Sequence, residues 1–139
     1  YGSVPWVEHM ETSNEEILLI VMTEDTQSLA AIAEVAAVDG VDLIALGPTD
    51  ISTALGMTDP SDPKLKQTFQ VLAAKIKAVG NAGVYIPVNH AACRFTPLDL
   101  LAMGVNYSSV APAPPTIVLN ALKASAQNIR EEVAMAAKT

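Results

Sequence analysis

The feature that most constrains this chain is the run from Asp42 to Ser52, which reads Asp-Leu-Ile-Ala-Leu-Gly-Pro-Thr-Asp-Ile-Ser. Its apolar residues 43–46 predict a short buried strand, and the Gly47-Pro48 corner that follows predicts a sharp change of direction. Asp50 therefore lies just past the carboxyl end of a buried strand. This is the position at which α/β proteins place their binding and catalytic groups.

The same arrangement occurs once more upstream. Residues 17–23 are almost continuously apolar, which is typical of a strand buried on both faces of a parallel sheet, and Glu24 follows them directly. A helical pattern over residues 27–38 joins the two strands. We therefore expect Glu24 and Asp50 at the same edge of one sheet. The residues alone leave a second interpretation open, in which Glu24 and Asp25 only cap the following helix.

Two further strands are predicted at residues 84–88 and 105–110, so the chain contains four strand patterns, each followed by a helical one. Asn89 and His90 come directly after the third strand and are expected at the same edge as the two acids. The helices that follow the last three strands are predicted at residues 49–54 and 63–80, from residue 97 to about 103, and at 116–137. We therefore predict a single α/β domain over residues 1–139, with about four βα units.

Taken together, these motifs resemble the HpcH/HpaI aldolase/citrate lyase family, and the resemblance covers most of the chain. The segments that carry it are Met22-Thr-Glu24-Asp25, Val38-Asp-Gly40-Val-Asp42 and Gly47-Pro-Thr-Asp50-Ile-Ser52. The resemblance implies a (β/α)8 TIM barrel, which needs about 250 residues. Because the chain has 139 residues and starts at Tyr1, we expect it to be the C-terminal half of such a barrel.

The resemblance also implies a metal site and a reaction. In that family the acids at the positions of Glu24 and Asp50 hold a divalent metal, and two carboxylates suit Mg²⁺ or Mn²⁺, with Co²⁺ as a further candidate. The implied activity is that of a class II aldolase, which cleaves a 4-hydroxy-2-oxo acid to pyruvate and an aldehyde with the metal as Lewis acid. The expected substrate contacts are Gly47, Pro48 and Thr49, at the start of a short helix whose free N–H groups favour an anion, and Asn89.

Part of the catalytic machinery is expected outside this chain. In the resembling family a histidine and an arginine from the early strands supply the base and the cation near the enolate, so the catalytic residues are unassigned here and the chain alone is expected to be inactive. His90 is a further candidate for substrate contact. Arg94 either neutralises an acidic substrate or pairs with a surface carboxylate. Met22 stands where the family often has Gln, and the Pro-rich segment 111–115 replaces a Gly/Asp-bearing turn.

Composition restricts the partners. A net charge of −7 makes nucleic acid an unlikely partner because an acidic chain repels phosphates, and no apolar run approaches the roughly 20 residues of a membrane helix. The single Cys93 fits a reducing cytoplasm. The expected partners are a small 2-oxo acid, an N-terminal half-barrel and further copies of the chain. Two other functions stay open: a non-catalytic α/β assembly domain, and a related lyase acting on an acyl-CoA or a dicarboxylic hydroxy acid.

Overall fold

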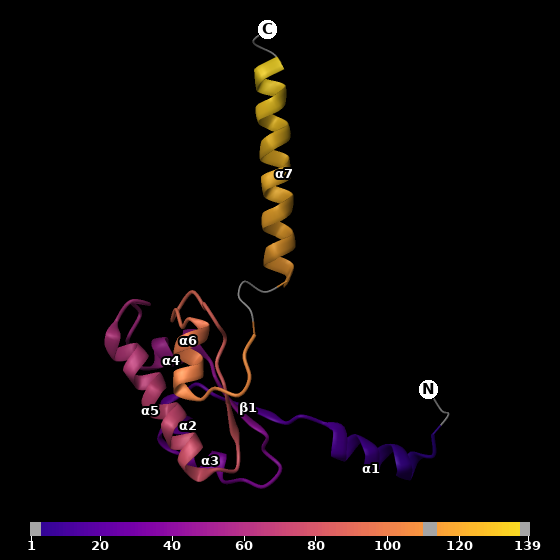
Figure 1. The fold of residues 1–139 in the computed structure, drawn as a ribbon, viewed down its shortest axis with the longest axis vertical. Coiled ribbons are helices and arrows are strands. Elements are labelled where there is room, and N and C mark those ends of the chain that lie inside the picture. The colour runs from indigo at the N-terminus through magenta and orange to yellow at the C-terminus, as the bar shows by residue number, and fades with distance from the viewer. Residues whose placement is uncertain (1–3, 110–113, 137–139) are drawn as a thin grey trace. The chain divides into compact units, whose positions relative to one another are not determined.

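The computed structural model describes residues 4–109 and 114–136. It has an α/β fold with an open, three-stranded, wholly parallel sheet in the order β1-β2-β3 (Figure 1). The chain divides into two units, residues 1–109 and 110–139. The elements of the first unit are α1 (Trp6–Glu16), β1 (Ile20–Thr23), α2 (Thr26–Ala30), α3 (Ile32–Ala36), β2 (Leu43–Leu46), α4 (Pro48–Ala54), α5 (Pro63–Val79), β3 (Gly83–Tyr85) and α6 (Pro97–Met103), and the second unit contains α7 (Pro114–Ala136).

The second predicted strand is confirmed as β2, whose four residues are all buried, whereas the prediction for β1 was partly wrong. Strand β1 covers Ile20–Thr23 rather than 17–23, and only Thr23 in it is buried. Met22 is 60% exposed. The reason is that β1 pairs only with β2 among the described strands, so it is an edge strand, and one of its two faces has no helix layer over it.

The third and fourth predicted strands are shorter than expected. Strand β3 ends at Tyr85, and the described residues 105–109 form one bridge, between Tyr107 and Tyr85, instead of a fourth strand. The Asn106 side chain makes the pairing irregular at its start, because its Oδ1 accepts the hydrogen bond of the Val84 N–H at 3.1 Å in place of a backbone carbonyl. Backbone hydrogen bonds continue beyond it, from the Ile86 N–H to the Tyr107 carbonyl and from the Val88 N–H to the Ser109 carbonyl. Val110, the predicted end of that strand, lies outside the described residues.

The hydrophobic core lies between one face of the sheet and the helices of the first unit. Strand residues Ile44, Leu46 and Val84 share it with α5, which contacts α3, β3 and α6. The apolar stripe of α5 is fully buried and consists of Leu65, Phe69, Leu72, Ala73 and Ile76. The helix predicted over residues 27–38 is divided into α2 and α3 at Ala31. The core therefore holds β2 and β3 in place, and the segments that follow their carboxyl ends are the candidate positions for a site.

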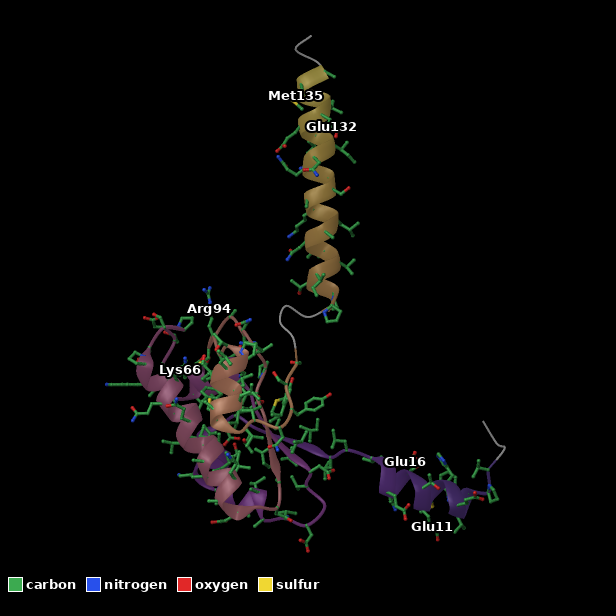
Figure 2. The ribbon with its side chains drawn as sticks, viewed as in Figure 1. Glu11, Glu16, Lys66, Arg94, Glu132 and Met135 are labelled. Carbon is green, nitrogen blue, oxygen red and sulfur yellow. The ribbon has the colours of Figure 1, made fainter. Side chains whose placement is uncertain are left out.

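Helices α1 and α7 contain no buried residue, and their side chains project outward (Figure 2). Helix α7 confirms the helix predicted over 116–137 up to Ala136, and the predicted residue 137 lies outside the described residues. Its exposed apolar side chains include Leu122, Ile129 and Val133. Contact of this helix with another subunit stays a prediction. None of the helices within residues 4–109 and 114–136 is long and apolar enough to cross a membrane.

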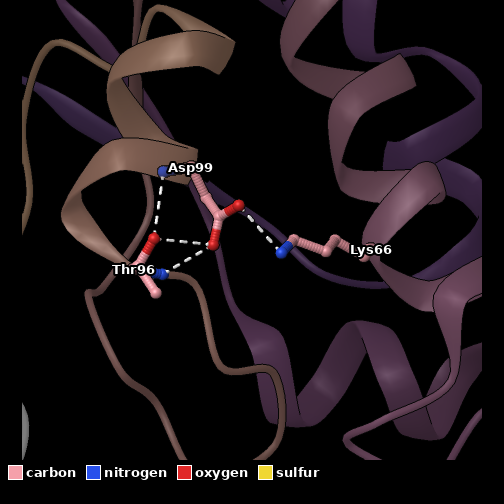
Figure 3. A network of polar contacts seen from close by, with 3 residues as sticks. All are labelled: Lys66, Thr96 and Asp99. Atoms are coloured by element: carbon pink, nitrogen blue, oxygen red, sulfur yellow. Dashed lines mark hydrogen bonds and ion pairs between the residues drawn. The ribbon is translucent and has the colours of Figure 1, made fainter.

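Helix α6 is tied to α5 by a small polar network (Figure 3). The Asp99 carboxylate pairs with Lys66 at 2.8 Å, and its second oxygen accepts hydrogen bonds from the backbone N–H and the hydroxyl of Thr96, both at 2.9 Å. The Thr96 hydroxyl in turn accepts from the Asp99 N–H, which completes a capping box at the start of α6. Lys66 and Thr96 together lower the pKa of Asp99 from 3.8 to about 2.

This lowered pKa predicts acid sensitivity at the α5–α6 contact. Because the folded-state pKa of Asp99 lies below its unfolded value, its stabilisation is present above pH 4 and is lost as the pH falls towards about 2. The side chains of Lys66 and Asp99 are 41% and 28% exposed, so solvent screening limits the effect to about 1 kcal/mol or less. Urea unfolding should show Asp99→Asn less stable than wild type at pH 6, with the difference shrinking as the pH falls from 4 to 2. A stability difference at pH 2 as large as that at pH 6 would contradict this.

Candidate metal centre

Glu24 follows the last residue of β1 and stands immediately before the cap of α2. Both the Glu24 N–H and the Asp25 N–H donate to Ser28 Oγ at 3.2 Å, and Asp25 Oδ1 accepts from the N–H groups of Gln27 and Ser28 at 2.8 Å. Asp25 is thus the N-cap of a complete capping box. The cap interpretation that the sequence left open therefore applies to Asp25, and the Glu24 carboxylate is left available for another role.

Asp50 lies in the first turn of α4, directly after β2. The chain turns at Gly47, Pro48 occupies the first position of the helix, and the Ile51 N–H donates to the Gly47 carbonyl at 3.0 Å. Proline suits this position because a first-turn N–H has no partner within the helix. A carboxylate in the first turn is also favoured by the helix dipole. The local sequence thus holds Asp50 at the strand end, where the sequence analysis expected it.

The structure brings these two carboxylates together over Gly47. A methyl group at this position would lie 2.9 Å from Glu24 Oε2 and 3.8 Å from Asp50 Oδ2. Any residue other than glycine would therefore intrude between the carboxylates or push Glu24 aside. The two acids reach the same small space although they come from different strands.

The carboxylate pair is electrostatically strained. The pKa of Glu24 is raised above its usual 4.5, first by desolvation, then by the negative charge of Asp50 and a hydrogen bond with the Asp50 side chain, and last by Asp25. The ion pair found within the described residues joins Lys66 to Asp99, so no described cation neutralises the two acids. A hard divalent cation would relieve this repulsion, and two oxygen ligands are a donor set that Mg²⁺ and Mn²⁺ accept while keeping waters. The residues present therefore fit the implied metal.

The number of protein ligands is small. Within the described residues, no group of three or more His, Cys, Asp and Glu side chains could hold a metal ion. A metal on Glu24 and Asp50 would thus keep several positions for water and substrate. The residue before Glu24 has an unusual polar atom: the hydroxyl of Thr23 is buried and has no hydrogen-bond partner among the described residues. Sequence reasoning missed this hydroxyl, because a threonine in an apolar run gives no signal of its surroundings.

The other predicted contact residues occupy the same edge of the sheet. Pro48 is buried and Thr49 exposed, and the Thr49 carbonyl accepts the Ser52 hydroxyl at 2.8 Å. Asn89 is exposed and adopts a left-handed conformation with φ of 51°, which asparagine tolerates better than most residues. No described contact tests the proposed binding roles of Gly47, Pro48, Thr49 and Asn89, and these stay predictions.

Cys93 and Arg94, on the loop after β3, show no sign of a reactive role. Cys93 is buried, and desolvation raises the pKa of its thiol to about 11, so it is protonated at neutral pH. Arg94 is exposed on the loop after β3 (Figure 2) and forms no ion pair among the described residues. It lines a cavity of about 540 Å³ together with Lys66, Asp59 and Asp62. The pairing of Arg94 with a surface carboxylate, one of its two expected roles, is not observed.

Comparison with known proteins gives a consistent result. The profile of the HpcH/HpaI aldolase/citrate lyase family matches residues 5–111. A hydroxypyruvate/pyruvate aldolase of Sagittula stellata is 38% identical over 84 residues, which is 60% of this chain and 32% of the relative. A 5-keto-4-deoxy-D-glucarate aldolase of Salmonella paratyphi C is 32% identical over 133 residues, which is 94% of this chain and 47% of the relative.

Solved structures agree with the sequence matches. The crystal structure of the citrate synthase SbnG superposes with a TM-score of 0.72 at 25% identity, covering 92% of this chain and 51% of that one. A family member from Burkholderia cenocepacia superposes with a TM-score of 0.64 at 23% identity, covering 88% and 46%, and shows the fold alone. The chain thus spans about half the length, or less, of the relatives it matches.

Proposed function

Because the chain belongs to the HpcH/HpaI aldolase/citrate lyase family, we propose that it is the metal-binding half of a divalent-metal-dependent carbon–carbon lyase. The reaction would be the cleavage of a 4-hydroxy-2-oxo acid to pyruvate and an aldehyde, or its reverse. The observation that carries this proposal is the convergence of Glu24 and Asp50 over Gly47 at the carboxyl ends of two parallel strands. The names of two relatives, a hydroxypyruvate/pyruvate aldolase and a 5-keto-4-deoxy-D-glucarate aldolase, support it.

The chain's own residues would prepare the site. Glu24 and Asp50 would hold Mg²⁺ or Mn²⁺, which when bound would polarise the substrate carbonyl and offset the negative charge that develops as the carbon–carbon bond breaks. Gly47 leaves the space over the pair open, and the Asp25–Ser28 capping box holds the backbone of Glu24 in place. The raised pKa of Glu24 means that acid weakens the site, because protonation removes one of the two ligand charges.

The proposal extends to the fold of the complete protein. We infer that β1, β2 and β3 belong to the C-terminal half of a (β/α)8 barrel, because the solved relatives are about twice as long and superpose on most of this chain. The sheet face that carries the exposed Met22 would then face the barrel interior. An N-terminal half-barrel would cover this face and supply the base and the cation, and α7 would serve contact between subunits.

A second function, assembly without catalysis, is favoured by one observation. Helix α7 is 23 residues long and buries none of them, although it exposes several large apolar side chains. Surfaces of this kind mark protein–protein contact. A lyase for an acyl-CoA or a dicarboxylic hydroxy acid would use the same carboxylate pair and differs only in the substrate.

The experiment that separates catalysis from assembly is a cleavage assay on the chain combined with its N-terminal half-barrel. With 4-hydroxy-2-oxopentanoate as the probe and Mn²⁺ present, we expect pyruvate release that stops on addition of EDTA and returns with Mn²⁺. Pyruvate is measured by coupling to NADH oxidation through lactate dehydrogenase. An assembly that forms, as judged by sedimentation, but shows no cleavage of this probe or of a dicarboxylic analogue would instead favour the structural role.

A further inference from the structure

The loop that follows β3 is held rigidly against the core. The Asn89 N–H donates to the Phe95 carbonyl at 2.9 Å, and the Cys93 N–H donates to the His90 carbonyl at 3.1 Å. Phe95 and Cys93 are buried, and the ring of Phe95 packs edge-on against Phe69 at 5.3 Å between centroids. These contacts hold the backbone of the loop against the core, and a binding site requires such a support for its side chains.

Within this loop, the backbone forms a hydrogen bond with the side chain of His90. The Ala92 N–H donates to His90 Nδ1 at 3.2 Å, so Nδ1 carries no proton, and the neutral imidazole carries its proton on Nε2. The side chain is half-buried. No described residue accepts a hydrogen bond from Nε2, and Nε2 is not sealed off from solvent. The segment after β3 therefore carries one imidazole donor that no described residue uses.

The position of this donor relates it to the carboxylate pair. Strand β3 pairs with β2, whose carboxyl end leads to Gly47 and Asp50, and β1 with Glu24 lies on the other side of β2. Neighbouring strands are about 4.8 Å apart, a distance of the order of a few carbon–carbon bonds. A substrate whose oxo-acid end lies over Gly47 would thus bring its more distant carbons towards the end of β3.

We propose that His90 is a specificity-determining residue that donates a hydrogen bond from Nε2 to an oxygen beyond C4, on the aldehyde-derived part of the substrate. This rests on the function proposed above. The substrate class it selects is a 4-hydroxy-2-oxo acid with a further hydroxyl or carboxylate oxygen, in preference to one with an alkyl end. A site built around a donor discriminates against analogues that lack the acceptor, because the donor is then left unpaired.

Two variants separate this role from loop bracing. His90→Asn keeps an acceptor near the position of Nδ1 for the Ala92 N–H and removes the distant donor. His90→Gln keeps a donor near the position of Nε2 and removes the bracing acceptor. Both are compared with wild type, in the assembly with the N-terminal half-barrel, on 4,5-dihydroxy-2-oxopentanoate and on 4-hydroxy-2-oxopentanoate, which lacks the C5 hydroxyl.

We expect His90→Asn to lower kcat/KM for the dihydroxy substrate by about tenfold, as for the loss of one hydrogen bond, and to leave the other substrate within about twofold. His90→Gln should retain most of the preference. Equal losses on both substrates, or an Asn variant that behaves like wild type, would overturn the proposal.

A second measurement reports the oxo-acid half of the site alone: the metal-dependent exchange of the C3 protons of pyruvate in D₂O, followed by NMR. If wild type exchanges these protons but the His90 variants cleave both substrates as wild type does, only the role of His90 is refuted. If wild type shows neither exchange nor cleavage, both proposals are refuted.

Discussion

Glu24→Gln and Asp50→Asn are each expected to lower the affinity of the complete barrel for Mn²⁺ by at least about 100-fold. Residues that only orient metal ligands already contribute about 10- to 100-fold to affinity, so a direct ligand should contribute more. The two substitutions keep the size of the side chains and remove one charge of a pair that meets over Gly47. Isothermal titration calorimetry measures the affinity, and the rise in thermal stability with added Mn²⁺ gives an independent value.

The matched control is Glu34→Gln, which removes one negative charge from an exposed position on α3. It should leave Mn²⁺ affinity within about twofold, because the Glu34 side chain is exposed and physiological salt screens exposed charges over a Debye length of about 8 Å. In the absence of metal, Asp50→Asn should also return the pKa of Glu24 towards 4.5, since the charge of Asp50 helps to raise it. Mn²⁺ binding that survives in the variant carrying both Glu24→Gln and Asp50→Asn would end the metal hypothesis, because the described residues contain no group of three or more His, Cys, Asp and Glu side chains that could hold the ion instead.

Gly47→Ala is expected to weaken Mn²⁺ binding by about 10- to 100-fold with little change in the free energy of unfolding, since it disturbs the position of a ligand. The added methyl group would lie 2.9 Å from Glu24 Oε2, closer than such contacts allow, so the flexible Glu24 side chain must move away. The backbone itself does not resist alanine, because Gly47 has a φ of −77°. Calorimetry and urea unfolding of the same variant measure the two effects separately.

Gly56→Ala provides the opposite control. Gly56 has a φ of +66° and nothing within 4 Å of an added methyl group. Alanine there should cost about 1–2 kcal/mol of stability, because the left-handed conformation is unfavourable for a side chain, while Mn²⁺ affinity stays unchanged. If Gly47→Ala instead lost stability and kept its metal affinity, the open space over the carboxylate pair would have no role in binding.

The sequence determined the local layout of this protein because that layout depends on neighbouring residues. The apolar run 43–46 became β2, Pro48 opened α4, and the stripe of α5 from Leu65 to Ile76 became core. The Gly-Pro-Thr-Asp-Ile-Ser motif identified the family. Local patterning could not decide burial at the edge of the sheet. Strand β1 has the composition of a central strand, yet Met22 is exposed, because β1 pairs only with β2 among the described strands.

Only the tertiary structure decided how residues distant in the chain meet. It placed the oxygens of Glu24 and Asp50 over Gly47, assigned the cap of α2 to Asp25, and replaced a ladder bond of β3 by the Asn106 side chain. It also directed the Ala92 N–H onto His90 Nδ1. A sequence pattern specifies which face of an element is apolar, but the direction and partner of a single polar atom depend on the packing of the whole fold. For that reason the sequence predicted the position of the two acids at one edge of the sheet, but not the small space that they share.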